Sequence, residues 1–296
     1  MSERLSVVVA IKERWPAARR CLDALYPQVT EAHGELIAPV EPGASPADRE
    51  TRYPGVVWID CKGKSIFELR ALAVDRARGA IVALTEDHAR VTPGWCRTML
   101  AAHAEHPEAA AIGGVVENGA TETAIDWASF FVSNSFYMAP VRPGPSEAIS
   151  LQANVSYKRR ALSMDSFGGG LMQMTFHDEL RRRGETLLAD PNLVVFHEQR
   201  MSFAEHSRAH FHNGRSIATF RLPTMSAAER VLRALGCAAL PPVMLMRTTR
   251  VVLAKRRHLE RFVEALPLTV WLLLCHAAGE LAGYVAGPGG SPWKVH

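Results

Sequence analysis

"IVALTEDHARVTPGW", residues 81–95, combines an apolar run with a cluster of polar side chains. Its first four residues are continuously apolar, which is typical of a strand buried on both faces of a parallel sheet. Glu86, Asp87 and His88 follow almost at once, and Pro93-Gly94 then turns the chain. Ligands of parallel sheets bind at the carboxyl ends of the strands. Two carboxylates and an imidazole at that point therefore predict a ligand site.

The surrounding sequence alternates strands with helices. Residues 5–11, "LSVVVAI", predict a buried strand, and a helix that begins near Pro16 follows it. The segments "GELIAPVEPGAS", "GVVWIDC" and "AAAIGGVVENG" predict further strands, separated by amphipathic helices. Such alternation builds βαβ units with right-handed crossovers. We expect one α/β domain over residues 1–222, with a mostly parallel, Rossmann-like sheet flanked by helices.

The composition is that of a globular protein. The chain has 296 residues, of which 48% are hydrophobic and 22% charged, enough for a sizeable core. Its five cysteines form no CxxC pair, which favours free thiols in a reducing compartment. No apolar leader precedes the first strand, so we expect no secretory signal. The net charge of +4 is modest, and no nucleic-acid partner is expected.

The composition of the sequence changes after residue 222. An apolar stretch, "VLRALGCAALPPVMLM", is followed by the basic "RTTRVVLAKRRHLERF" and by the apolar "ALPLTVWLLLCHAAGELAGYVAG". The last stretch has about the length of a membrane span, roughly 20 residues. Residues 223–296 therefore predict a hydrophobic helical hairpin that associates with the cytoplasmic face of the cell membrane. His276 and Glu280 interrupt it, so a pair of core helices in a soluble subdomain stays open.

The order of these pieces resembles a family 2 glycosyltransferase with the GT-A fold, of the membrane-associated type. Four segments within residues 5–222 carry the resemblance: "LSVVVAIKERWPAARRCLDAL", "RARGAIVALTEDHARVTPGWCRTMLAAH", "NVSYKRRAL" and "DELRRRGETLLADPNLVVFHE". It implies an inverting, metal-dependent enzyme. Such an enzyme moves a sugar from a nucleotide-diphosphate donor to a lipid-linked or polysaccharide acceptor.

The resemblance also gives the acidic strand end a purpose. The family places an Asp-x-Asp motif there to hold a divalent metal, which offsets the charge on the diphosphate leaving group. Here the motif reads Glu86-Asp87-His88. The resemblance implies that Glu86 and Asp87 meet the donor, and that Asp87, His88 and His197 hold Mn²⁺ or Mg²⁺. Imidazole ligands shift the preference towards Mn²⁺. The structural alternative is a strand end solvated by its carboxylates.

The donor nucleotide should lie at the ends of the first strands. The sequence departs from the family at nearly every side chain of that region, so the base is not implied. The candidate donor-binding positions are Ala10, Ile11, Lys12, Glu13, Glu41 and Arg70. An ordinary surface role for Arg70 stays open.

The catalytic base is the weakest part of the resemblance. Counting back from Gly184, the family's Glu-Asp pair falls on Met172 and Gln173, and neither can accept a proton. Asp178 is a nearby carboxylate and the first candidate, although a helix-surface ion pair with the adjacent arginines would also explain it. Glu117, after "IGGVV", is the second candidate.

Further polar residues fall outside the motif. Asp126 lies beside aromatic residues that would suit an acceptor, and His206 and His210 lie four apart, a weak zinc pattern. His212 or Arg215 would suit a phosphate. A plain solvated helix explains the last four residues as well.

Two other classes of protein compete with a glycosyltransferase. A nucleotidyltransferase usually carries a glycine-rich loop after its first strand, and "AIKERWPAA" has no glycine. A catalytically impaired membrane scaffold or sugar-binding protein with the same fold is favoured by Met172 and Gln173. The acidic motif speaks against that second alternative. The sequence gives neither the sugar nor the acceptor.

Overall fold

The computed structural model describes residues 4–12, 15–44, 46–162, 167 and 170–295. The chain forms two compact units. We call Met1–Gly119 with Tyr137–Glu198 the sheet unit, and Ala120–Phe136 with Gln199–His296 the helical unit. From Gln199 onward the whole chain belongs to the helical unit. The domain boundary at residue 222 stays a prediction.

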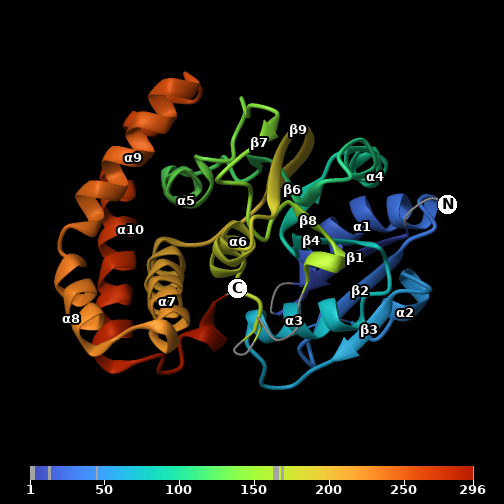
Figure 1. The fold of residues 1–296 in the computed structure, drawn as a ribbon, viewed down its shortest axis with the longest axis horizontal. Helices are drawn as coiled ribbons and strands as arrows, with labels where there is room; N and C mark the ends of the chain where they lie inside the picture. Colours follow the sequence, from blue (N-terminus) through green and yellow to red (C-terminus); the bar gives the residue numbers. More distant parts are fainter. Residues whose placement is uncertain (1–3, 13–14, 45, 163–166, 168–169, 296) are drawn as a thin grey trace. The chain divides into compact units, whose positions relative to one another are not determined.

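The sheet unit is built on one central sheet with the strand order β3-β2-β1-β4-β8-β6-β9-β5 (Figure 1). Strands β3, β2, β1 and β4 run parallel to one another, as do β6 and β9. Strand β8 lies antiparallel between β4 and β6. The strands are β1 (Leu5–Ala10), β2 (Glu35–Val40), β3 (Val57–Asp60), β4 (Ile81–Glu86), β5 (Ala89–Val91), β6 (Ala109–Asn118), β7 (Gly144–Pro145), β8 (Val155–Lys158) and β9 (Thr186–His197).

Helices cover both faces of this sheet. Those of the sheet unit are α1 (Trp15–Glu31), α2 (Arg49–Arg52), α3 (Ile66–Arg76), α4 (Trp95–Glu105) and α6 (Gln173–Arg182). Val7 and Val9 pack with residues of α1 and α4, whereas Val8 and Leu84 pack with residues of α3 and α6. Successive residues of a strand point to opposite faces, so β1 and β4 are buried along their whole length. The predicted α/β architecture is confirmed.

Asn154 ties three elements of the sheet unit together. It lies in "NVSYKRRAL", one of the four segments that carry the resemblance, and its side chain is fully buried. Its Nδ2 donates to the carbonyl oxygens of Val115 and Leu193 at 2.9 and 3.0 Å. Its Oδ1 accepts a hydrogen bond from Trp95 Nε1 at 2.9 Å. The side chain therefore joins β6, β9 and α4.

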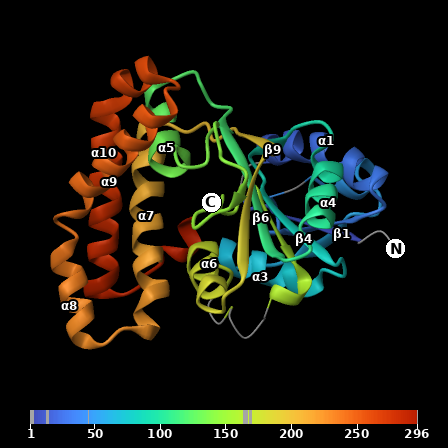
Figure 2. The ribbon, with the colours of Figure 1, turned by 45° about the horizontal axis from the view of Figure 1, so that its top comes forward.

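The helical unit consists of α5 (Ala124–Asn134), α7 (Phe203–Arg221), α8 (Ala227–Gly236), α9 (Leu240–Lys255) and α10 (Leu259–Ala286). Helices α7 and α10 lie side by side (Figure 2). A Cβ atom at Gly279 would overlap the carbonyl of Phe211, so a glycine is required at this helix contact. The last α-helix of the chain, α10, is apolar, as expected.

Two segments of the helical unit are apolar enough to cross a membrane by length and composition. One is α10, of which 44% of the most apolar window is buried. The other is α8 together with α9, which are bent by 65° at their junction. Length and composition alone do not distinguish such helices from the core helices of a soluble protein.

The interior position of Asn154 leads to a stability prediction. Asn154→Ala should lower the free energy of unfolding by about 3–5 kcal/mol, because three buried partners lose their hydrogen bonds. Urea denaturation measures the change. Asn192→Ala removes an exposed asparagine of the same unit and is the matched control. Equal stability of the two variants would contradict the structural role.

Two buried histidines predict how stability depends on pH. Burial lowers the pKa of His103 and of His177 from 6.5 to about 3. Between these values the unfolded chain binds protons that the folded chain does not. The free energy of unfolding should therefore fall as the pH falls from 6.5 towards 3, by about 1.4 kcal/mol per pH unit for each histidine.

Denaturation at a series of pH values tests this dependence. His103→Gln keeps a group that can bond Ser156 Oγ, which lies 2.8 Å from His103 Nε2, but it removes the titrating ring. The slope of stability against pH should then decrease by about one proton. An unchanged slope would show that His103 does not contribute.

Candidate metal and donor site

The ends of β1, β2 and β4 meet at one edge of the sheet. In the parallel register of β1 and β4, Ala10 pairs with Glu86. Ile11 then bridges to Val40 at the end of β2. The acidic motif therefore adjoins the strand ends that were predicted to bind the donor.

A second pairing brings His197 to the same place. Strands β5 and β9 pair antiparallel, with Ala89 opposite His197. The backbone N–H of Glu198 donates to the carbonyl oxygen of His88 at 2.7 Å. His88 and His197 lie far apart in the sequence, but their rings approach edge to face with centroids 4.6 Å apart.

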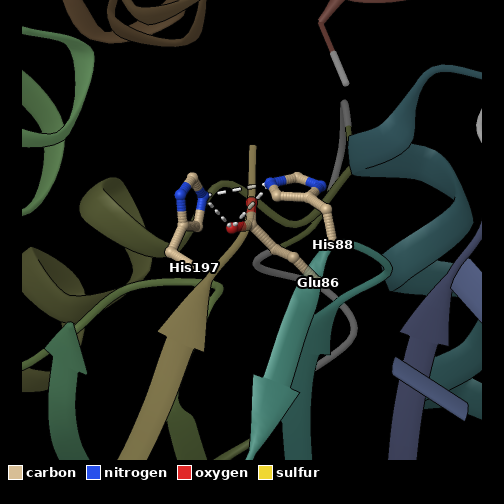
Figure 3. Close-up of side chains that lie close together, drawn as sticks. All are labelled: Glu86, His88 and His197. Carbon is tan, nitrogen blue, oxygen red and sulfur yellow. Dashed lines mark hydrogen bonds and ion pairs between the residues drawn. The ribbon is translucent and has the colours of Figure 1, made fainter. Parts of the chain in front are cut away.

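Three side chains converge at this point, as Figure 3 shows. The Nε2 atoms of His88 and His197 lie 3.0 Å apart. Glu86 Oε2 lies 3.2 Å from His197 Nε2 and 3.5 Å from His88 Nε2. In the part of the chain that the structure describes, this is the one group of three or more histidine, cysteine or acidic residues with ligand atoms close enough for a metal.

The spacing and chemistry of these atoms fit a divalent cation. Ligand atoms bound at about 2.0–2.2 Å in tetrahedral or octahedral geometry lie roughly 3.0–3.5 Å from one another. One carboxylate oxygen and two imidazole nitrogens suit Mn²⁺ and later transition metals. The residues present therefore fit a metal.

The groups around the three ligands hold them in position. Asp87 Oδ1 lies 2.9 Å from His88 Nδ1, which places the proton on Nδ1 and leaves Nε2 free to bind a metal. Arg70 Nη2 donates to Glu86 Oε1 at 3.3 Å. Two of the three predicted ligands, His88 and His197, belong to the group. The third, Asp87, contacts Nδ1 of His88 instead. Glu86 supplies the third ligand atom.

The charges of the site are strongly coupled. Burial by itself would raise the pKa of Glu86, but His88, His197 and Arg70 outweigh it and lower the pKa to about 2. Burial would lower the pKa of His88, but Glu86 and Asp87 outweigh it and raise the pKa. Glu86 therefore stays ionised, and protons compete with a metal for His88 in acid.

Glu198 is a supporting residue that the sequence reasoning missed. Its carboxylate accepts hydrogen bonds from Arg20 Nε on α1 at 3.0 Å and from Arg90 Nε on β5 at 2.8 Å. Its backbone bonds His88, as described above. The signal was its place directly after His197 in "FHE". A glutamate at a strand end is too common to identify alone.

The remaining donor candidates belong to the ends of β1 and β2 and to α3. Lys12 is buried just after β1, and Arg70 is buried on α3. Glu41 donates its backbone N–H to the carbonyl of Ile11 at 3.2 Å, which places it beside the end of β1. Glu13 lies outside the described residues.

The two candidate bases have different surroundings. Glu117 lies near the end of β6, paired with Phe196, one position before His197 along β9. Its Oε1 accepts the backbone N–H of Ala139 at 3.2 Å. Asp178 has a side chain that is 56% exposed and forms an ion pair with Arg181 on the same helix. That contact is the surface alternative considered from the sequence.

Met172 and Gln173 are both buried at the start of α6. The amide oxygen and nitrogen of Gln173 have no hydrogen-bond partner among the described residues. The two positions that the resemblance assigns to the base therefore hold side chains that cannot remove a proton.

The other polar candidates form contacts inside the helical unit. His206 Nε2 lies 3.1 Å from Asp126 Oδ1, and His210 Nε2 lies 3.1 Å from Ser129 Oγ. Arg215 Nε donates to the carbonyl of Gly287 at 2.8 Å. His212 Nδ1 lies 3.0 Å from Ser291 Oγ. These contacts are typical of helix packing.

Comparison with known proteins adds the fold. No family model matches the chain, and no curated protein matches it. Among solved structures, the mannosyltransferase PcManGT from Pyrobaculum calidifontis, in complex with GDP-Man and Mn²⁺, is similar with a TM-score of 0.54 at 15% identity. That alignment covers 95% of this chain and 88% of that chain.

Two further glycosyltransferase structures resemble the chain. GalNAc-T7 with UDP, GalNAc and Mn²⁺ gives a TM-score of 0.51 at 13% identity, over 68% of this chain and 44% of that chain. TarS 1-349 of S. aureus gives 0.50 at 11% identity, over 94% and 90%. This chain thus spans less than half of the GalNAc-T7 chain. At these identities the comparisons show a GT-A-like fold.

The convergence of three ligands leads to a binding prediction. His88→Ala removes one ligand atom and should weaken Mn²⁺ binding about ten-fold or more, about 1.4 kcal/mol. Isothermal titration calorimetry measures the affinity. His106→Ala removes an exposed histidine of the same unit and should leave binding unchanged. Equal Mn²⁺ affinity in both variants would rule His88 out as a ligand.

Proposed function

We propose that this chain is a metal-dependent glycosyltransferase that uses a nucleotide-diphosphate sugar as its donor. The observation that carries the proposal is the convergence of Glu86, His88 and His197 at the carboxyl edge of a GT-A-like sheet, next to the end of β1. Ligands of α/β sheets bind at this edge. The three structural neighbours are glycosyltransferases, and two of them hold Mn²⁺ with a nucleotide.

The chemistry follows from the charge that transfer creates. A divalent ion, Mn²⁺ or Mg²⁺, bound by these residues would offset the negative charge that develops on the departing diphosphate. Arg70 holds one oxygen of Glu86 and leaves the other directed at the two imidazoles. Asp87 fixes the ring of His88. The protein therefore keeps its ligand atoms oriented before a substrate arrives.

We assign proton removal from the acceptor to Glu117 rather than to Asp178. Glu117 belongs to the sheet edge that carries His197, because the neighbouring Asn118 pairs with that histidine. Asp178 is exposed and engaged with Arg181 on its own helix. An inverting transfer needs a carboxylate within reach of the attacking hydroxyl.

The acceptor that we propose is a lipid-linked sugar or a glycan, as in the membrane-associated members of glycosyltransferase family 2. The support is the apolar, basic C-terminal segment, which would bring the enzyme to a lipid carrier at the cytoplasmic face of a membrane.

A second function has one observation in its favour. The buried Gln173 stands where the family has its base, so a protein that binds sugar nucleotides without transferring the sugar would show the same start of α6. Transfer assays distinguish that protein from an enzyme.

The test of the proposal is donor binding. A panel of UDP- and GDP-sugars, with UDP and GDP alone, is scored by thermal shift with Mn²⁺ and with EDTA. A true donor raises the melting temperature by mass action, and only when Mn²⁺ is present. His197→Ala should abolish the shift, and His106→Ala should keep it. A shift that is indifferent to EDTA and to His197 would contradict the metal-dependent function.

The assignment of the base gives a separate prediction. Glu117→Gln should lower transfer by about 10²–10⁴-fold, because the amide cannot take the acceptor proton. Mn²⁺-dependent binding of the donor should be preserved. Asp178→Asn is the matched control and should transfer at the rate of the parent chain. Undiminished transfer by Glu117→Gln would remove Glu117 as the base.

A further inference from the structure

The exposed apolar surface of this protein is concentrated in one segment. The structure describes seventeen large apolar side chains as exposed, and fourteen of them belong to residues 223–296. In the sheet unit the single one described is Val57 on β3, which is 39% exposed. Isolated exposed apolar residues are ordinary, but such a concentration marks an interaction surface.

Helix α8 shows this exposure of apolar side chains most clearly. None of its residues is buried, and Val231, Leu232 and Leu235 are 60, 70 and 72% exposed. The side chain of Arg230 is exposed as well, and its Nη2 donates to the carbonyl oxygen of Val285 on α10 at 2.9 Å. A surface helix of a soluble protein turns its apolar face inward instead.

The neighbouring helix α10 also exposes large apolar side chains, although most of its buried residues are apolar too. Its buried face carries His276 and Glu280, whose side chains lie 3.2 Å apart, and Glu280 also accepts from Arg221 Nη1 of α7 at 3.1 Å. Its outward residues include Val263 and Val285, which are 69 and 64% exposed. The helical unit therefore pairs some of its buried charged groups with one another and presents many large apolar groups outward.

The positive charge of the chain gathers in the same segment. Residues 223–296 hold nine lysines and arginines against four aspartates and glutamates, a net charge of +5. The whole chain carries only +4, so the remainder is nearly neutral. Exposed cations lie between the apolar residues, at Arg233 on α8 and at Arg250 on α9, with Arg256 at the junction of α9 and α10.

We propose that the outward face of α8 and the exposed residues of α9 and α10 bind the surface of an anionic phospholipid bilayer. Apolar side chains enter the headgroup region, and the arginines between them meet lipid phosphates. A second copy of the chain, itself positive on this face, is a poorer match because like charges would be apposed.

The segment lies in the interface and does not cross the bilayer. Arg247 and Arg250 fall near the middle of α9, where the hydrocarbon core of a bilayer would surround them. Charged side chains at that depth are strongly disfavoured. One side of α10 is occupied by α7, a helix that carries six histidine or arginine residues, at positions 206, 208, 210, 212, 215 and 221. A position parallel to the surface keeps all of these groups near water.

The experiment is sedimentation of the full-length protein with vesicles. Vesicles of equal parts phosphatidylcholine and phosphatidylglycerol should bind it, and vesicles of phosphatidylcholine alone should bind at least about ten-fold less. Leu232→Glu with Leu235→Glu should reduce binding to anionic vesicles at least about ten-fold. Val57→Glu is the control, because it places the same charge on an exposed apolar site of the sheet unit, and it should bind like the parent chain.

A second pair of variants separates charge from apolar insertion. Arg250→Gln with Arg256→Gln should remove the preference for anionic vesicles and keep the weak binding to neutral ones. Circular dichroism melting checks that each variant is folded. Carbonate at high pH should release the bound protein.

Three results would overturn the proposal. The first is a parent chain that ignores anionic vesicles. The second is a bound protein that carbonate leaves in place, which would indicate a spanning segment. The third is a lipid-free dimer that Leu232→Glu with Leu235→Glu converts to monomer, which would show that a second copy covers this face. Donor binding at Glu86, His88 and His197 is measured without lipid, so it stands or falls separately.

Discussion

The pairing of β5 with β9 is the constraint on which the candidate site depends. The backbone N–H of Glu198 donates to the carbonyl oxygen of His88. Because His197 directly precedes Glu198, this bond brings the two histidines together. The parallel register of β1 with β4 sets Glu86 at the same height as Ala10. Side chains at neighbouring strand ends are already close to one another, so strand pairing positions the ligand atoms of the site. A shift of one residue in either register would turn a ligand to the other face.

The packing below this edge explains why these registers are fixed. Buried apolar residues on both faces of β1 and β4 allow only one register to place every side chain in a core. Asn154 adds polar specificity, because its amide bonds two strands and the indole of Trp95 with no free group left over. Buried polar groups that are fully satisfied select one arrangement, whereas a displaced strand would leave them without partners.

The two compact units differ in how many large apolar side chains they leave exposed. The sheet unit buries its apolar residues and exposes charges, as a protein in water does. The helical unit has an apolar core too and buries the pair Asp126 with His206, but it leaves many more large apolar side chains exposed. Burial, and not hydropathy, therefore distinguishes the C-terminal helices.

The α/β sheet, the apolar C-terminal helix and the place of the acidic motif could all be predicted from the sequence alone. Each of these follows from local patterns, namely apolar runs of strand length, turn residues and strand-helix alternation. The tertiary structure alone decided that Glu86 and not Asp87 meets the two histidines, and that Glu198 supports them. It also decided that Asp178 is a surface residue and that Asn154 is structural. Periodicity fixes which residues share a face of one element, but contacts between residues about 110 positions apart depend on how the strands pair in three dimensions.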